Sequence, residues 1–151
     1  MVVLDTTPDE EDHDPTVTAS ERAAQMVRIA ADAAADKLAD GIIAYDVSEQ
    51  LVITDAFLLC SAPTDRQVRA IVEEVEKRLR EEAQAKPIRR EGERDGRWVL
   101  LDYIDIIVHI QHEEDRRFYA LERLWKDCPQ IELPEDVNAH AAQRVRAGES
   151  P

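Results

Sequence analysis

The longest apolar run in the chain covers residues 97–111 and reads RWVLLDYIDIIVHIQ. Three polar residues interrupt its interior, and these are Asp102, Asp105 and His109. Residues 98–101 and 106–110 are rich in β-branched and aromatic side chains, which predicts two strands. The four residues between them, 102–105, predict a tight turn. We therefore expect a hairpin around which the rest of the fold is organised.

The predicted hairpin is apolar on both faces. Side chains alternate along a strand, so Trp98 and Leu100 point to one face, and Val99 and Leu101 point to the other. A strand that is apolar on both faces needs a covering layer on each side, or a partner chain on one of them. The aspartates of the run fall at the turn, where a carboxylate can reach water or a basic partner.

Hydrophobic periodicity predicts the remaining elements. Capping-box sequences at residues 18–21 and 64–67 mark the starts of two helices. In chain order we predict a helix over 19–39, strands over 42–47 and 56–61, a helix over 65–85 and, after the hairpin, a helix over 113–126. Blocks of strands that alternate with helices indicate an α/β fold, with a mixed β-sheet flanked by helices.

The length of 151 residues and the hydrophobic content of 44% are sufficient for one domain with one core. Residues 1–17 are acidic and lack periodicity, so we expect a disordered acidic N-terminal tail. We assign the folded domain to residues 18–130 and a polar C-terminal tail to residues 131–151. The sequence has neither an apolar run of the ~20 residues that span a bilayer nor a secretory signal. We therefore expect a cytoplasmic protein that binds no membrane.

The formal net charge of −14 restricts the classes of partner. Nonspecific nucleic-acid binding needs many cations that neutralise phosphates, so we expect no DNA binding. An acidic surface suits a basic protein partner, although acidity can also serve only to keep a protein in solution. Of the two cysteines, Cys60 lies in an apolar strand and is expected to be buried and inert, whereas Cys128 can be exposed after the last helix.

Asp102 and Asp105 are candidate carboxylates for general acid–base or metal chemistry. A two-metal site requires a further carboxylate near them. The competing interpretation is turn chemistry, because aspartate favours turns through local hydrogen bonds. We expect a turn with a partner contact rather than catalysis. On a strand, His109 and His112 would point to opposite faces, so we predict neither a metal site nor a cofactor.

Trp98 opens the first strand of the hairpin, close in sequence to Tyr103 and to charged residues. This composition is typical of an interface anchor, and core packing is the alternative interpretation. The residues that we assign to partner binding are Trp98, Asp102, Tyr103 and Asp105.

Three strings of residues together resemble one known family. They are TDRQVRAI at 64–71, WVLLDY at 98–103 followed by Asp105 and by IVHI at 107–110, and residues 116–125 with Tyr119, Leu121, Glu122, Leu124 and Trp125. The combination extends over residues 20–130 and is similar to the ribosomal silencing factor family, which is also called the Iojap family.

The resemblance implies a translational repressor and no enzymatic activity. Members of the family bind the large ribosomal subunit on the face that meets the small subunit, through ribosomal protein fourteen of the universal numbering. Their presence on that face sterically blocks the association of the subunits. They have a nucleotidyltransferase-like fold without catalytic residues, and they often form homodimers. For this chain we therefore expect ribosomal protein fourteen of the large subunit as the partner, and a homodimer as a possibility.

The chain departs from the family pattern at two positions, and two rival functions stay open. Relatives often carry glycine where this chain has Ala62 and Ile104, and we expect Ile104 to avoid a positive φ. The first rival is a nucleotidyltransferase-like enzyme that uses Asp65, Asp102 and Asp105. The second rival is a dimerising scaffold with no role on the ribosome.

Overall fold

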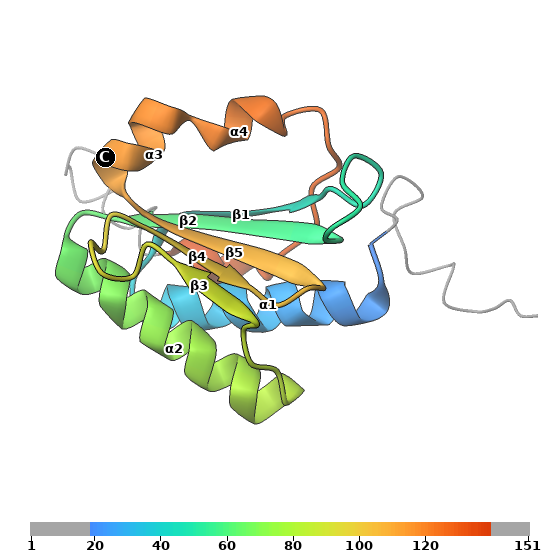
Figure 1. Cartoon of the computed structure of the whole chain (residues 1–151), viewed down its shortest axis with the longest axis horizontal. Helices are drawn as coiled ribbons and strands as arrows, with labels where there is room; N and C mark the ends of the chain where they lie inside the picture. The colour runs from blue at the N-terminus through green and yellow to red at the C-terminus, as the bar shows by residue number, and fades with distance from the viewer. Residues whose placement is uncertain (1–18, 140–151) are drawn as a thin grey trace, which may run out of the picture.

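The structure is a computed structural model and describes residues 19–139. At its centre is a five-stranded mixed sheet with the strand order β1-β2-β5-β4-β3 (Figure 1). The elements in chain order are α1 (Glu21–Asp36), β1 (Asp40–Asp46), β2 (Ala56–Ala62), α2 (Asp65–Ala83), β3 (Arg89–Glu91), β4 (Trp98–Asp102), β5 (Ile106–His112), α3 (Glu113–Tyr119), α4 (Leu121–Leu124) and a short 3-10 helix (Glu135–Asn138). The predicted α/β class with a mixed sheet flanked by helices is confirmed.

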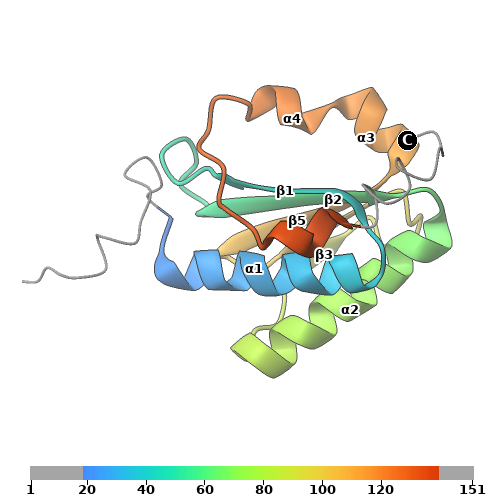
Figure 2. The same ribbon diagram turned by 180° about the vertical axis from the view of Figure 1, so that it is seen from behind.

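Helices cover both faces of the sheet. α1 and α2 lie against one face, and α3 and α4 lie against the other (Figures 1 and 2). The main core lies on the α1–α2 side and includes Val99 and Leu101, while a smaller core lies under α4 with Leu100 packed at its edge. The predicted alternation along β4, and the need for a layer on each side, are therefore confirmed.

Both helices on the main-core side begin at hydroxyl caps. The side chain of Ser20 accepts a hydrogen bond from the backbone nitrogen of Ala23 at 3.0 Å. The side chain of Thr64 does the same for Gln67 at 3.1 Å. These contacts satisfy N–H groups that the first turn of a helix leaves unpaired. The capping sequence at 64–67 predicted the start of α2 correctly, whereas α1 is capped by Ser20 and not by the first residue of the predicted capping box at 18–21.

Strand direction determines which residues share an end of the sheet. β2 and β5 are neighbours and run parallel, whereas β4 runs antiparallel to β5. The carboxyl ends of β2 and β5 therefore lie at one end, and the turn at residues 103–105 lies at the other. A seven-residue strand is about 23 Å long, so roughly this distance separates the start of α2 from the β4–β5 turn.

Two elements differ from the sequence prediction. The polar link before the hairpin contains a fifth strand, β3, whose three residues are charged and exposed and so carry no hydrophobic signal. The predicted helix over 113–126 is divided into α3 and α4, because Ala120 has a left-handed φ of 49° and ends the first of them.

The chain beyond residue 130, predicted as a polar tail over residues 131–151, packs on the domain as far as the structure describes it. Ile131 and Val137 are 4% and 3% exposed and belong to the main core. The side-chain amide of Asn138 pairs with both the backbone nitrogen and the carbonyl oxygen of Ile42, at 2.9 and 3.1 Å. The segment therefore covers the edge of β1, and the folded domain extends past residue 130.

The predicted N-terminal tail, residues 1–17, lies outside the described residues, as does the predicted C-terminal tail after residue 139. In the part of the chain from 19 to 139, no helix has both the length and the apolar character needed to cross a membrane.

Candidate protein-docking surface

A row of six side-chain rings crosses the α3–α4 side of the sheet. Neighbouring ring centroids are 4.9 to 6.1 Å apart. The middle of the row is buried, and its α3 end is exposed. We call this set the aromatic row; in spatial order it consists of Phe118, Tyr119, Trp98, His109, Phe57 and Trp125.

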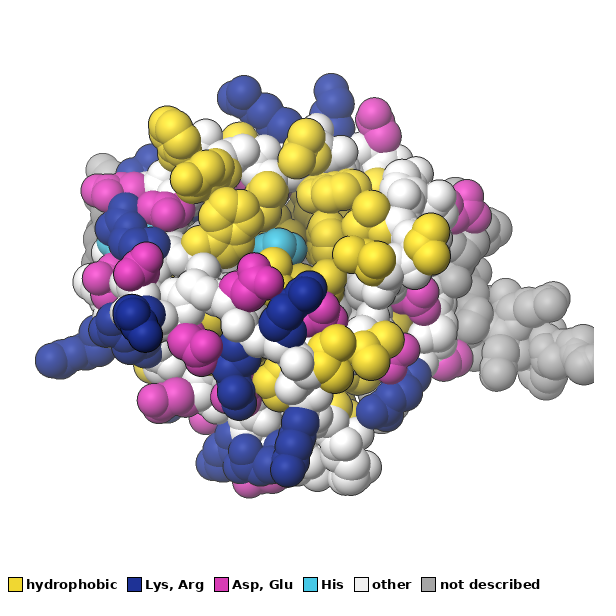
Figure 3. Space-filling view, in the orientation of Figure 1, with side chains coloured by type: hydrophobic (Ala, Val, Ile, Leu, Met, Phe, Trp, Pro, Cys, Tyr) yellow, Lys and Arg dark blue, Asp and Glu magenta, His cyan; other side chains and the backbone are white. Residues whose placement is uncertain are grey.

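The aromatic row is part of a larger apolar surface. Figure 3 shows hydrophobic side chains gathered around one histidine, where the surface is hollowed. Phe118 is 80% exposed, Tyr119 50% and Leu124 69%, and Trp98 is half-buried. A contiguous apolar patch of this kind on a folded domain commonly marks a site for another molecule.

Three neighbouring strands supply the middle of the row. Phe57 comes from β2, His109 from β5 and Trp98 from β4. Alternate residues of a strand point to the same face, so all three side chains are directed to the α3–α4 side. The sequence therefore predicted correctly that Trp98 and Leu100 share a face, and Leu100 lies opposite His109 in the β4–β5 pairing.

A hydrogen bond joins Trp98 to His109, with the indole Nε1 donating to the imidazole Nδ1 at 3.1 Å. An indole nitrogen only donates, so Nδ1 is the unprotonated acceptor and the neutral ring carries its proton on Nε2. Burial lowers the pKa of His109 to about 4, which keeps the ring neutral at pH 7.

Asp102 is 8% exposed and supports the turn. Its Oδ1 accepts a hydrogen bond from the backbone nitrogen of Ile104 at 2.9 Å, and its Oδ2 lies 3.3 Å from a guanidinium nitrogen of Arg89 on β3. The turn chemistry considered for this residue is present. Because Arg89 compensates its charge, Asp102 offers a partner little free negative charge.

Tyr103 lies on the other side of the sheet from Trp98. It is 5% exposed and belongs to the main core, and burial raises the pKa of its hydroxyl. The alternation that directs Trp98 outward turns Tyr103 inward. Tyr103, which the sequence assigned to partner binding, is therefore buried on the face opposite Trp98.

The turn itself is strained and partly exposed. Ile104 has a φ of 72° and is 56% exposed, which corrects the expectation that it avoids a positive φ. The contact with Asp102 and a 2.8 Å bond from the Asp105 nitrogen to the Tyr103 carbonyl hold this conformation. The side chain of Asp105 is 41% exposed and lies 3.5 Å from Arg22. Of the two turn aspartates, Asp105 is the more accessible.

The carboxylates of the rival enzyme are not brought together. Asp65 is the first residue of α2, beyond the carboxyl end of β2, while Asp102 and Asp105 lie at the opposite end of the sheet. Across residues 19–139 no three His, Cys, Asp or Glu side chains form a group that could hold a metal ion. Nothing in this arrangement supports a nucleotidyltransferase site made from these three residues.

The remaining candidates have structural partners. His112 is the N-cap of α3, and its Nδ1 accepts a hydrogen bond from the backbone nitrogen of Glu114 at 3.1 Å. Cys60 is fully buried, as predicted, and burial raises the pKa of its thiol to about 12. Cys128 is 8% exposed rather than open to solvent, and its sulfur lies 3.4 Å from the side chain of Gln50.

Arg116, on α3, fixes the position of the two outer helices. Its guanidinium donates to Glu122 on α4 at 2.7 Å, to the Ser61 hydroxyl at 3.1 Å and to the Asp40 carbonyl at 3.2 Å. A β-carbon at Gly41 would come within 2.7 Å of this guanidinium, so the strand leaves room for it. No local sequence pattern predicts this role, because Ser61 and Asp40 are far from Arg116 along the chain.

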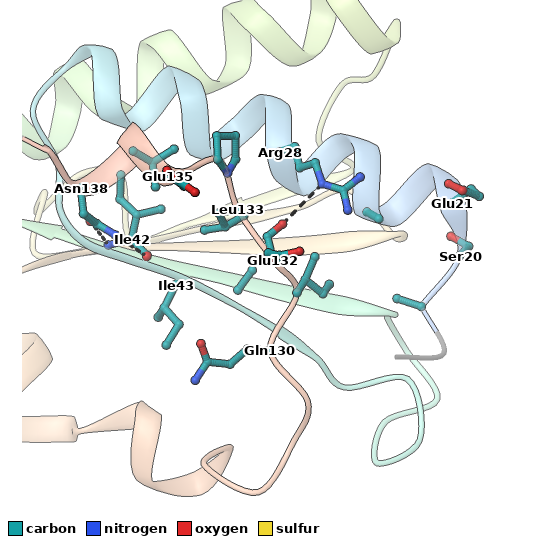
Figure 4. A pocket seen from close by; sticks show the side chains of 16 residues that line it. Ser20, Glu21, Arg28, Ile42, Ile43, Gln130, Glu132, Leu133, Glu135 and Asn138 are labelled. Atoms are coloured by element: carbon teal, nitrogen blue, oxygen red, sulfur yellow. Dashed lines mark hydrogen bonds between the residues drawn. The ribbon is translucent and has the colours of Figure 1, made fainter. Parts of the chain in front are cut away.

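A separate pocket of about 700 Å³ lies between α1, β1 and the C-terminal segment (Figure 4). Across it, Arg28 donates to the backbone carbonyl of Glu132 at 3.4 Å, and Asn138 holds the backbone of Ile42. Its lining mixes apolar side chains with charges of both signs. The pocket therefore marks the crossing of the C-terminal segment over β1 and favours no particular class of ligand.

Comparisons with known sequences point to one family. A family model described as "Ribosomal silencing factor during starvation" matches residues 20–150. The chain is 39% identical over 114 residues to ribosomal silencing factor RsfS of Bacillus subtilis, covering 75% of this chain and 95% of that protein. It is 31% identical over 129 residues to the chloroplastic protein Iojap of Zea mays, covering 82% of this chain and 54% of that protein.

Two solved structures share the fold. A crystal structure from Chromobacterium violaceum aligns with a TM-score of 0.65 at 29% identity, covering 68% of this chain and 84% of that chain. A crystal structure from Bacillus halodurans aligns with a TM-score of 0.62 at 35% identity, covering 72% of this chain and 98% of that chain.

Proposed function

Because the chain belongs to the family of ribosomal silencing factors, we propose that it binds the large ribosomal subunit through ribosomal protein fourteen and sterically blocks association with the small subunit. The consequence is repression of translation in the cytoplasm. The observation that carries the proposal beyond the family is the aromatic row, which offers an apolar surface for a protein to cover.

Within this proposal the aromatic row supplies most of the contact energy. Binding energy at protein interfaces is concentrated in a few aromatic and arginine side chains that are desolvated on docking. Phe118 and Tyr119 have much surface left to bury, and Trp98 lies between them and the buried centre of the row. These three residues are therefore the anchors that we assign to the partner.

Charge has a different role. Asp105 keeps an accessible carboxylate at the far end of β4, and the chain as a whole is acidic, which complements a basic ribosomal protein. Electrostatic attraction of this kind speeds and orients docking more than it tightens the complex. Asp102 and Tyr103 affect partner binding indirectly. Asp102 holds the turn through its hydrogen bond to the backbone of Ile104, and Tyr103 anchors the turn in the main core.

A homodimer is the second candidate use of the same surface. An exposed apolar row can be covered by another copy of the chain as well as by a ribosomal protein, and the dimerising scaffold is the rival function that this observation favours. If both partners use the row, a dimer competes with the ribosome by mass action, and dilution favours ribosome binding. Concentration-dependent mass measurements on the free chain distinguish this case.

The test is co-sedimentation of the purified chain with large ribosomal subunits. We expect Phe118→Ala to weaken binding by about tenfold, because truncation of an anchor at an interface commonly costs more than 1 kcal/mol. Trp98→Ala should weaken it further, since it also removes the bond to His109. A sucrose gradient of both subunits with added chain then tests whether subunit association is blocked.

The matched control is Leu38→Ala. Leu38 is 54% exposed at the end of α1, away from the aromatic row, so its loss removes a similar apolar side chain from a different surface. Equal binding by wild type, Phe118→Ala and Leu38→Ala would remove the aromatic row from the interface. Failure of the wild-type chain to sediment with large subunits would reject the proposed function itself.

A further inference from the structure

The centre of the aromatic row contains a hydrogen-bond donor that the fold leaves unused. His109 is 6% exposed, and its Nε2 is completely buried without a hydrogen-bond partner among residues 19–139. The other ring nitrogen, Nδ1, is occupied by the Trp98 indole, which assigns the proton of the neutral ring to Nε2. Within the described part of the chain, this buried N–H group therefore has no acceptor.

Two aromatic rings lie against the His109 ring. The rings of Phe57 and His109 form a T-shaped pair with a centroid distance of 5.0 Å and an interplanar angle of 82°, and the Trp98 ring lies 6.1 Å away on β4. A buried donor without an acceptor destabilises a folded protein, and most native donors are satisfied. Burial also disfavours the charged ring, and the pKa of about 4 agrees with a neutral donor.

We propose that the Nε2–H of His109 donates a hydrogen bond to a main-chain carbonyl oxygen of the protein that docks on the aromatic row. This inference rests on the proposed function and names the chemistry that the partner brings to the site. A partner that lacks an oxygen at this point would leave the donor buried and unpaired in the complex. The histidine therefore selects the register of the partner, while the rings around it provide contact area.

The acceptor is a neutral oxygen because of the apolar surroundings. A carboxylate or phosphate at this point would lose its hydration among Phe57, Trp98 and His109. One hydrogen bond from a neutral donor would not offset the free-energy cost of that desolvation. A main-chain carbonyl keeps its strength as an acceptor and can be carried on a segment whose side chains are apolar. Such a segment also suits the exposed rings of Phe118 and Tyr119.

The helices on the His109 side of the sheet bury little, which favours access of the partner's carbonyl oxygen to the ring. α3 and α4, which lie on this side of the sheet, have no buried residue, unlike α1 and α2. The hollow beside a histidine in Figure 3 lies in this surface. Leu121 and Trp125 are half-buried against the smaller core on this side, and the proposed hydrogen bond requires side chains of this kind to move and open a path to Nε2.

The experiment compares the full chain carrying Trp98→Phe with the chain carrying both Trp98→Phe and His109→Phe. Trp98→Phe is the reference because it removes the indole donor, so that the second change leaves no internal group unpaired. We measure the affinity for purified large ribosomal subunits by co-sedimentation, and the stability by urea unfolding. We expect roughly tenfold weaker binding for the double variant, with an unfolding midpoint equal to or above the reference.

A purely structural histidine would lower stability and binding together, so that result would overturn the inference. Equal binding by the two proteins would also overturn it. His109→Gln in the wild-type background is the second variant, because its amide can accept from Trp98 and still donate outward. The His109→Gln chain should retain binding to large subunits. A loss of binding by this variant, with its stability unchanged, would contradict the proposal. If the wild-type chain does not bind large subunits, the proposed function is wrong and this inference fails with it.

Discussion

The two faces of the sheet are covered in different ways. On the main-core side, α1 buries seven residues and α2 buries five, whereas on the other side α3 and α4 bury none. Arg78 of α2 also joins the carboxylates of Asp32 and Asp36 on α1 at 2.6 and 2.8 Å, so the two long helices form one layer. The outer helices depend on Arg116 for a comparable link.

Under the proposed function, this difference separates the face that stabilises the fold from the face that binds the partner. The strands are shared, so the contrast comes from the helices that cover them. The main-core side is packed mostly with aliphatic side chains, while the aromatic row leaves large rings exposed. Groups that contribute little to folding but are held in a fixed arrangement are typical of a binding surface.

The largest expected effect is on the main-core side. Leu79 of α2 is fully buried, so Leu79→Ala should lower the free energy of unfolding by about 2–5 kcal/mol through lost contacts and a cavity. Phe118→Ala, on the exposed end of the aromatic row, should change it by less than about 0.5 kcal/mol. Urea unfolding followed by circular dichroism measures both. A similar cost for the two changes would show that the outer face is a structural core.

The next effect is a pH dependence that comes from His109. Burial lowers its pKa from an ordinary 6.5 to about 4, so between these values the unfolded chain binds a proton that the folded chain does not. Its contribution to stability is complete above pH 6.5 and is lost as the pH falls to about 4, a change on the order of 3 kcal/mol.

This dependence is isolated by comparing urea unfolding of the Trp98→Phe chain and of the Trp98→Phe, His109→Phe chain at pH 7 and pH 5. Carboxylates titrate in both proteins, so the difference between them reports the histidine. If the two proteins lose the same stability at pH 5, the ring is already charged or exposed in the folded state.

The smallest expected effect concerns the turn at the end of β4. Ile104 holds a φ of 72°, which costs an L-residue about 1–2 kcal/mol, and glycine adopts this conformation without that cost. Glycine also increases the conformational entropy of the unfolded chain, which offsets part of this gain. Ile104→Gly should therefore raise the free energy of unfolding by a net of roughly 0.5–1 kcal/mol. Ile104→Ala is the control and should gain less. A loss of stability on Ile104→Gly would mean that the exposed side chain makes contacts that outweigh the strain.

The sequence predicted those features of the fold that depend on residues close together along the chain. The cap at Thr64 and the alternation along β4 depend on neighbouring residues, so the sequence predicted them, whereas the cap of α1 lies at Ser20, two residues after the start of the predicted capping box. β3 was missed because three charged residues carry no hydrophobic signal, and the division of the last helix was missed because it depends on the backbone of Ala120.

The four residues that the sequence assigned to partner binding do not share one surface. Trp98 is half-buried in the aromatic row and Asp105 is accessible, whereas Tyr103 is buried on the other face, because residues close along a chain need not share a face. The sequence analysis did not assign Phe118 or Arg116 to the docking surface, since their roles depend on contacts with residues from other elements.

By itself, the sequence determined the fold class, the order of its main elements and the family, because hydrophobic periodicity, capping residues and matching strings are properties of the chain. Only the tertiary structure decided which face of the sheet has few buried helix residues over it, which rings meet, and that the His109 donor has no acceptor between residues 19 and 139. Exposure and hydrogen-bond satisfaction depend on distant segments that pack against one another, so they become defined only when the chain is folded.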